Sequence, residues 1–508
     1  MLRDLQTPLS RRQAAHLLRR ACVSADPDKV AAATGRLARE VVEEWVSEPL
    51  SSALYPSPSW VYRLYPPTGA SQEEVAAFNE ANGYYVREVR EILLQDLMRG
   101  TMRSRMTLFW HNHFVTDVRK YRYGTLAYRY VQRLTLGALG DFKAVTRGFV
   151  RDGSMLYYLD GRFNRDDAPN ENFARELLEL FTMGPIGPDG TPNYSQEDIV
   201  EAARALTGWR MDVRSTWDAF KASWAYDAGL KKIFDVSGYW DENDLIDLIF
   251  QERSHQVAHF IASKLIAEFV YNEPDPILVE DLTQRLLAHD FQIGPTLVDL
   301  FASEAFFEPH CEGVRIKSPT ELMLLDVSAF KGAPSQDNFS FIYAGLRNLG
   351  QDLLSPPNVA GWPGHHAWLS TDTLPRRWSS VDTNFASADS SLNSSVLGVD
   401  YNAIMEKYTD DASDHPAISL ALNLAEALFA IPLSLVEVPE IDQPFAGDLV
   451  GQPLPQDLLD GPAERINLVK QFLGTVPWYE WDPGSHHASI MIRNFIVTLS
   501  KYPEYQLA

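Results

Sequence analysis

A carboxylate at the edge of an apolar helical stripe is the clearest chemical feature of this sequence. Residues 169–183 (PNENFARELLELFTM) predict a helix whose apolar stripe consists of two phenylalanines and two leucines. Glu176 lies beside that stripe, so its carboxylate is expected to be half-buried, where it must either find a partner or have a raised pKa. Such a group either has a structural role, with its charge balanced by an arginine or a helix N-terminus, or has a functional role as a metal ligand or general base.

The other polar residues of this helix have simple local explanations. Arg175 lies on the far side of the helix, four residues after Glu171 and four before Glu179, and both spacings favour ion pairs. Asn170 and Asn172 are suited to cap the N-terminus. In a catalytic site, Arg175 would instead clamp an anion and Asn172 would contact the substrate.

The segment 106–114 (MTLFWHNHF) contains two histidines whose use depends on the backbone conformation. In a helix, His113 shares a face with aromatic residues while His111 points away. In an extended strand, both imidazoles point to one face and could bind a divalent metal together, with Glu176 as a third ligand. The alternative is that both are hydrogen-bonded core histidines.

Loops rich in glycine and proline could complete a pocket around these groups. Asp160 comes shortly before the helix predicted over 169–183, and Trp209 follows the helix predicted over 196–206. Residues 356–364 (PPNVAGWPG) cannot form a helix interior and supply Asn358 and Trp362. Loops of this kind either shape binding sites or cover cores.

Helical periodicity dominates the rest of the chain. It predicts an all-α, multi-helical globular fold with long loops and at most a few short strands, such as residues 232–236. Capping boxes start two of the helices, at Ser195 with Asp198 and at Ser318 with Glu321. The predicted helices cover residues 13–20, 37–46, 73–98, 171–183, 196–206, 257–269, 277–287, 294–302, 319–330 and 488–500.

Composition limits the class of protein. The 508 residues carry a formal charge of −23, which argues against nucleic-acid binding because lysine and arginine are not in excess. Only Cys22 and Cys311 are present, so there is no disulfide framework. No signal peptide and no membrane-spanning apolar stretch is evident, so we expect a soluble, cytoplasmic protein. Polar linkers predict a helical core over 1–390 and a helical extension over 391–508 packed on it.

Several long motifs occur in an order typical of one bacterial family. The chain resembles the family catalogued as "domain of unknown function 1800". The resemblance covers most of residues 1–380. It rests on HLLRRA (16–21), MTLFWHNHF, YLDG (158–161), PNENFARELLELFTMG (169–184), YSQEDIVEAARALTGW (194–209), KSPTE (317–321) and LGQDLLSPPNVAGWPG (349–364).

The resemblance implies a partner rather than an activity. No established activity of the family can be carried over. Its members are often exported, so export by a route other than a signal peptide is the alternative to the cytoplasmic location expected above. They are often encoded beside sulfatase-like proteins of a second uncharacterised family. Members usually contain His-Asp-x-Gly-x-Lys. Here Tyr226 replaces the histidine, which would impair this member if that histidine were catalytic or a ligand, while Asp227, Gly229 and Lys231 remain.

Two hypotheses follow. The first is a hydrolase or metal-assisted enzyme acting on a polar substrate, with Glu176 as base or ligand and His113 as acid, base or ligand. Its remaining site residues would be Arg175, Asp160, Trp209, Asn358, Trp362 and Asn172. The second is a non-catalytic helical scaffold that binds a partner protein. A histidine within about 3 Å of Glu176 would favour the enzyme, and histidines tied separately into the core would favour the scaffold.

Overall fold

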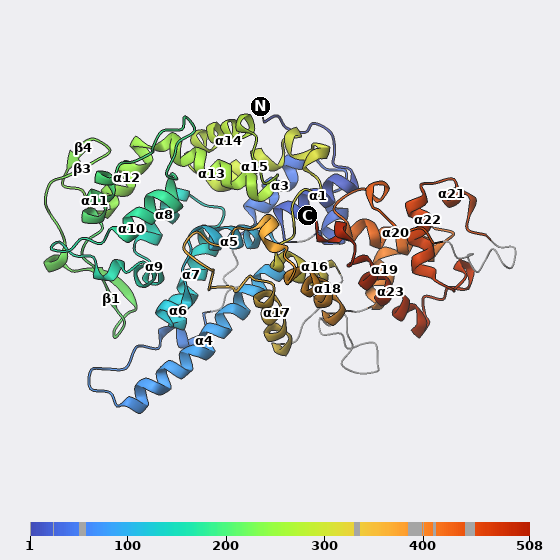
Figure 1. The fold of residues 1–508 in the computed structure, drawn as a ribbon, viewed down its shortest axis with the longest axis horizontal. Coiled ribbons are helices and arrows are strands. Elements are labelled where there is room, and N and C mark those ends of the chain that lie inside the picture. The colour runs from blue at the N-terminus through green and yellow to red at the C-terminus, as the bar shows by residue number, and fades with distance from the viewer. Residues whose placement is uncertain are drawn as a thin grey trace. The chain divides into compact units, whose positions relative to one another are not determined.

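The computed structural model describes residues 2–23, 25–49, 57–329, 336–384, 399, 401–409, 413–441 and 453–508 (Figure 1). They form two compact units, each assembled from separate stretches of chain. The first unit contains Met1–Thr7, Arg36–Phe306 and Asp352–Pro363, and the second contains Pro8–Gly35, Phe307–Gln351 and Gly364–Ala508. The boundary expected near residue 390 lies outside the described residues, so the division into 1–390 and 391–508 stays a prediction.

The predicted α-dominated fold is confirmed. The first unit contains α3 (Ala38–Ser47), α4 (Gln72–Met98), α5 (Met102–His113), α6 (Val118–Tyr121), α7 (Gly124–Gly137), α8 (Phe142–Val150), α9 (Gly153–Tyr158), α10 (Glu171–Glu176), α11 (Gln196–Ala205), α12 (Glu242–Glu252), α13 (Ser254–Phe269), α14 (Pro276–Ala288) and α15 (Ile293–Phe301). The second contains α1 (Arg11–Ala21), α2 (Pro27–Ala33), α16 (Pro319–Ala329), α17 (Gln336–Asn348), α18 (Thr373–Asn384), α19 (Tyr401–Tyr408), α20 (Pro416–Leu428), α21 (Gln456–Leu459), α22 (Ala463–Leu473) and α23 (His486–Leu499). None of the described helices is long and apolar enough to cross a membrane.

Strands are few and short. β1 (Trp209–Asp212) pairs antiparallel with β2 (Asp218–Lys221), and β3 (Lys231–Ile233) with β4 (Val236–Gly238). The single strand predicted over 232–236 is wrong, because Phe234 and Asp235 have φ of 51° and 66° and form the turn of a hairpin. Two successive left-handed residues reverse the chain where an alternating pattern alone indicated extended backbone.

Local hydrogen bonds confirm the predicted helix starts. Ser195 and Asp198 exchange side-chain bonds with each other's backbone N–H at 3.2 and 2.8 Å. Ser318 and Glu321 do the same at 3.1 and 2.7 Å. Each box satisfies two N–H groups that the first helical turn leaves free.

The helix predicted over 169–183 changes type along its length. Asn170 caps α10 by accepting from the Asn172 N–H at 3.0 Å, as predicted. From Leu177 to Thr182 the helix is a π-helix, and the Thr182 hydroxyl donates to the Leu177 carbonyl at 2.7 Å. The wider turn alters the i,i+4 register. Arg175 pairs with Glu171 at 3.1 Å, as predicted, because both lie in the α-helical part. Glu179 lies in the π-helix and accepts from the Tyr194 hydroxyl at 3.1 Å instead of pairing with Arg175.

An aromatic core surrounds α5 and fixes its position in the first unit. The Trp110 ring stacks on Phe142 at 5.4 Å between centroids, and its Nε1–H donates to the Ala138 carbonyl at 3.0 Å. Phe114 stacks on Phe149 at 4.3 Å. Most side chains of α5 are buried, as expected for a helix that is apolar on several faces.

Candidate functional site

The helical conformation of α5 decides how its two histidines are used. α5 continues to His113, so the extended alternative, with both imidazoles on one face, does not occur. His111 and His113 are two residues apart, which places them about 200° apart around the helix axis. The two imidazoles consequently contact different parts of the first unit.

His111 is fully buried and both of its ring nitrogens are used. Nε2 accepts a hydrogen bond from the Leu354 backbone N–H at 3.0 Å, so the proton is on Nδ1, which donates to the Tyr130 hydroxyl at 2.9 Å. That hydroxyl in turn donates to the Phe114 carbonyl at 2.9 Å. Burial lowers the pKa of His111 to about 4, so the imidazole is neutral.

His113 is tied to the π-helix. Its Nε2–H donates to the Phe181 carbonyl at 3.0 Å, and Nδ1 accepts from Lys264 Nζ at 3.1 Å. Burial, followed by the charge of Lys264, holds the pKa of His113 well below its ordinary value. Burial also lowers the pKa of Lys264, to about 8. Lys264, on α13, was missed by the sequence analysis because no local pattern links it to residue 113.

Asn112, between the two histidines, holds a third segment. Its Oδ1 accepts from the Trp362 N–H at 2.7 Å, and its Nδ2 donates to the Trp362 carbonyl at 3.1 Å. The loop before Trp362 comes so close that a Cβ on Gly361 would lie 2.2 Å from Oδ1 of Asn112. Sequence analysis missed this residue, although a polar side chain inside a buried helix was a signal that it needs a partner.

Glu176 is half-buried, as predicted, and has no hydrogen bond or ion pair to any residue that the structure describes. Burial, followed by the charge of Glu179, raises its pKa, while Arg175 opposes the shift. The neighbouring Tyr158, which the sequence analysis missed, has its pKa raised to about 12 by burial, then by Asp117 and Glu176. Glu176 is thus a carboxylate that the surrounding helices do not neutralise.

The predicted metal ligands do not converge. Over the described ranges, no group of three His, Cys, Asp or Glu side chains could hold a metal ion. The lone pair of His111 Nε2 already accepts a peptide N–H, and that of His113 Nδ1 accepts from Lys264. His111, His113 and Glu176 therefore do not fit the donor set of a divalent cation.

Three other predicted catalytic or binding residues lie in α10 or in the loop before it. Arg175 donates to Glu171 and to Gln196, both at 3.1 Å. Asp160 is exposed with a left-handed φ of 58°, and its carbonyl accepts from Asn170 at 3.4 Å. Asn172 donates to the Leu159 carbonyl at 3.4 Å. These contacts order the helix N-terminus and the loop before it.

The predicted binding residues Trp362, Asn358 and Trp209 lie in loops or at the start of a strand, and each contacts a neighbouring group. Trp362 is buried, with its ring edge-on to His111 at 5.3 Å. Asn358 is exposed and accepts from the Ala360 N–H at 2.9 Å, which closes its turn. Trp209 is buried at the start of β1, where the Arg151 guanidinium lies 5.6 Å from its ring. Each of the three residues thus contacts a different part of the first unit.

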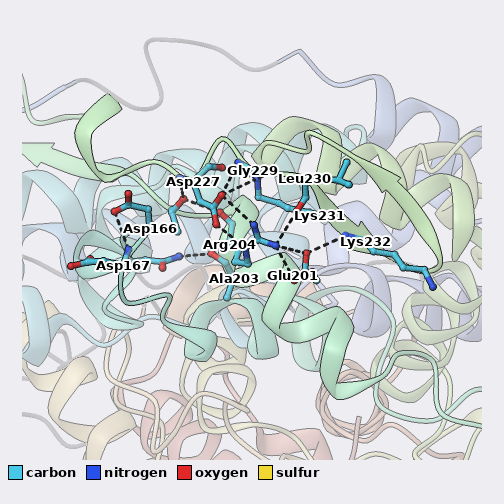
Figure 2. A network of polar contacts seen from close by, with 12 residues as sticks. Asp166, Asp167, Glu201, Ala203, Arg204, Asp227, Gly229, Leu230, Lys231 and Lys232 are labelled. Carbon is cyan, nitrogen blue, oxygen red and sulfur yellow. Dashed lines mark hydrogen bonds and ion pairs between the residues drawn. The ribbon is translucent and has the colours of Figure 1, made fainter.

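The segment around Asp227 forms a separate polar network (Figure 2). Asp227 accepts from Arg204 at 2.7 Å and from the Gly229 N–H at 2.8 Å. Burial alone would raise the pKa of Asp227, but the hydrogen bonds from Arg204 and Gly229 and the charges of Arg204 and Lys231 together outweigh it, and the pKa is lowered. Lys231 is buried and donates to the carbonyls of Asp227 and Gly229 at 2.7 and 3.0 Å. The Asp-x-Gly-x-Lys residues thus stabilise their own turn.

Tyr226, which precedes this turn, interacts with cations. Lys221 Nζ lies 3.8 Å from the centroid of its ring, and Lys231 Nζ lies 5.5 Å away. Lys221 also forms an ion pair with the buried Glu242. An aromatic ring at position 226 therefore stabilises a lysine that neutralises a buried carboxylate.

Comparison with protein families agrees with the motifs. A family model described as "Protein of unknown function (DUF1800)" matches residues 16–460. The chain belongs to this family. No curated protein and no solved structure matches the chain. Two of the motifs that carry the resemblance to DUF1800 proteins, MTLFWHNHF and NVAGWPG, meet in the structure through Asn112 and Trp362.

Proposed function

We propose that this DUF1800 protein is a non-catalytic helical scaffold that binds a partner protein. The observation that carries the proposal is that His111, Asn112 and His113 each bind a backbone group of a different segment, at Leu354, Trp362 and Phe181. Side chains used in this way hold loops against a helix. They are not free to bind substrate or transfer protons.

A surface suited to a partner lies at the β1 end of the first unit. We call it the aromatic patch, and it consists of Phe163, Phe220 and Trp224 with Arg162 and Arg210. The three aromatic side chains are 59%, 48% and 72% exposed. Arg162 lies 4.3 Å from the Phe163 ring and Arg210 lies 5.1 Å from the Trp224 ring. Tryptophan and arginine dominate the binding energy of protein interfaces, and exposed apolar clusters mark interaction sites.

The aromatic patch has two halves, one formed by Arg162 and Phe163 and the other by Arg210, Phe220 and Trp224. Hydrogen bonds to backbone groups hold these halves together. The Asp166 N–H donates to the Ala225 carbonyl at 3.1 Å, which joins the segment after Phe163 to the one after Trp224. Arg210 also donates to the Asn164 carbonyl at 3.1 Å. The patch is therefore ordered before a partner binds, which lowers the entropy cost of association.

The partner we propose is the sulfatase-like protein that the family resemblance implies. The test is co-purification of the full chain with that protein, followed by calorimetric measurement of the dissociation constant. Trp224→Ala and Phe163→Ala should each weaken binding at least about tenfold. Tyr84→Ala is the matched control, because Tyr84 is an exposed aromatic on α4 that also stacks with an arginine, Arg87, at 5.2 Å. The proposal would be overturned if no complex forms, or if Tyr84→Ala weakens binding as much as Trp224→Ala and Phe163→Ala do.

The second candidate function is hydrolysis of a polar substrate at Glu176. It is favoured by one observation, the half-buried carboxylate without a partner among the described residues and with a raised pKa. A general acid or base contributes about 10²–10⁴-fold to a rate. Chromogenic esters, glycosides and phosphate esters are to be assayed with wild type and Glu176→Gln. If Glu176→Gln is folded and its turnover falls by this factor, the result would support the enzymatic function. If its turnover equals that of wild type, Glu176 takes no part in the chemistry.

A further inference from the structure

A hollow of about 480 Å³ lies within the second unit, and all of its lining residues belong to that unit. It is bordered by α1, α2, the segment after α20 and the start of α22. Its apolar lining includes the buried side chains of Ala25, Val30, Phe429, Ala430 and Leu433. Its size and apolar lining are those of sites for small organic molecules, which range from about 300 to 1,000 Å³.

Charged side chains around this hollow are mostly of one sign. Four arginines and one glutamate line it, namely Arg11, Arg12, Arg19, Arg465 and Glu426. In a chain with a net charge of −23, such a local excess of positive charge is a specific feature rather than a general property of the surface.

The arginines differ in how far the protein itself neutralises them. Arg12 forms an ion pair with Glu312, and Arg19 is buried and donates to the carbonyls of Glu426 and Ala427 at 2.9 and 3.1 Å. Arg465 lies 3.8 Å from Glu426, with its side chain 40% exposed. Arg11 has no hydrogen bond or ion pair to any residue in the described part of the chain. Arg11, and Arg465 with its long ion pair of 3.8 Å, are therefore the cations least neutralised by the protein and most available to a ligand.

We infer that this hollow binds a small amphipathic carboxylate, with an aliphatic body against the apolar lining and the carboxylate at Arg11 and Arg465. Burial of an aliphatic chain against this lining is favourable because it removes apolar surface from water. A guanidinium fork matches the two oxygens of a carboxylate, which fixes the orientation of the head group. The inference does not depend on the proposed scaffold function, because the hollow and the aromatic patch belong to different units.

The test uses the full-length chain and isothermal titration with decanoate, decan-1-ol and decyltrimethylammonium. We expect decanoate to saturate the protein at an equimolar ratio and the neutral and cationic probes to bind at least about tenfold more weakly. Arg11→Ala and Arg465→Ala should each weaken decanoate binding several-fold. These side chains are at least partly exposed, so their removal should leave the fold intact. Arg376→Ala is the control, because Arg376 is an exposed arginine of the second unit paired with Asp372 and does not line the hollow.

A third variant tests the apolar lining. Val30→Trp would fill the hollow and should abolish decanoate binding, with circular dichroism and the melting temperature reporting whether the fold is kept. The inference is overturned if wild type shows no saturable binding of decanoate, if decan-1-ol binds equally well, or if Arg11→Ala and Arg465→Ala bind decanoate as wild type does.

Discussion

Asn112 pairs through its side-chain amide with both backbone polar groups of Trp362, at 2.7 and 3.1 Å, although the two residues are 250 positions apart. An amide can make two such bonds to one residue because it carries an acceptor and a donor side by side. The pairing fixes the loop that contains Gly361 and Trp362 against the end of α5. The asparagine between the two histidines of α5 therefore has a structural role.

Removal of this pairing should cost stability. Asn112→Ala leaves the N–H and carbonyl of Trp362 without their partner, and we expect the free energy of unfolding to fall by about 1–3 kcal/mol. Urea unfolding followed by circular dichroism measures the change. Asn79→Ala, at an exposed position of α4, is the matched control and should change the value by less than about 0.5 kcal/mol. Equal effects of the two variants would contradict the role of Asn112.

Gly361 should tolerate no side chain. Its φ is +83°, and an added Cβ would lie 2.2 Å from Oδ1 and 2.7 Å from the carbonyl oxygen of Asn112. Gly190 has a similar φ of +79°, but an added Cβ there would meet no atom within 4 Å, so Gly190→Ala should cost only the backbone strain of about 1–2 kcal/mol. Gly361→Ala should destabilise clearly more, as measured by urea unfolding of both variants. If the two costs are equal, the close approach to Asn112 is not significant.

The two buried histidines should make stability fall in mild acid. Burial lowers the pKa of His111 from 6.5 to about 4, and the pKa of His113 is lowered as well. Below pH 6.5 the unfolded chain binds protons that the folded chain does not, so stability is present above that pH and is lost as the pH falls toward 4. Each histidine contributes a slope of at most about 1.4 kcal/mol per pH unit. Urea unfolding at several pH values should show a shallower slope for His111→Gln than for wild type, and an unchanged slope would count against a buried neutral His111.

Glu176→Gln should not destabilise the protein at neutral pH. The folded-state pKa of Glu176 is raised above 4.5 by burial and by Glu179, so the folded protein binds this proton more tightly than the unfolded chain. The resulting stability is present below pH 4.5 and is lost as the pH rises through the raised pKa, so the charged form is unfavourable at pH 7. The thermal midpoint of Glu176→Gln should equal or exceed that of wild type. Glu171→Gln, which loses the Arg175 pair, should show no gain, and a lowered midpoint for Glu176→Gln would reveal a partner.

The ring of Tyr226 should matter more than its hydroxyl. Lys221 Nζ lies 3.8 Å from the ring centroid, and the hydroxyl makes no hydrogen bond to a described residue. Tyr226→Phe keeps the cation–π interaction and should leave the free energy of unfolding within about 0.5 kcal/mol of wild type. Tyr226→Ala should lose about 0.5–2 kcal/mol. Chemical denaturation of both variants tests this, and a large loss in Tyr226→Phe would contradict it.

Much of the secondary structure near the candidate site could be predicted because its causes are local. Helix periodicity and the capping box at Ser195 and Asp198 depend on residues three or four positions apart, and the half-burial of Glu176 follows from its angle to the apolar stripe. The π-helix at Leu177–Thr182 could not be predicted in this way. It involves the Thr182 hydroxyl and the contact of Phe181 with His113, and the second of these comes from a distant segment.

The sequence by itself determined that this protein is α-dominated, belongs to one family, and carries a lone carboxylate at the edge of a helix. Only the tertiary structure decided what the histidines do, because their partners lie far along the chain: Leu354 is 243 residues from His111 and Lys264 is 151 residues from His113. A histidine's chemistry depends on which group holds each ring nitrogen. Here those groups are brought close only by the packing of α5 against α7, α13 and the loop at Leu354.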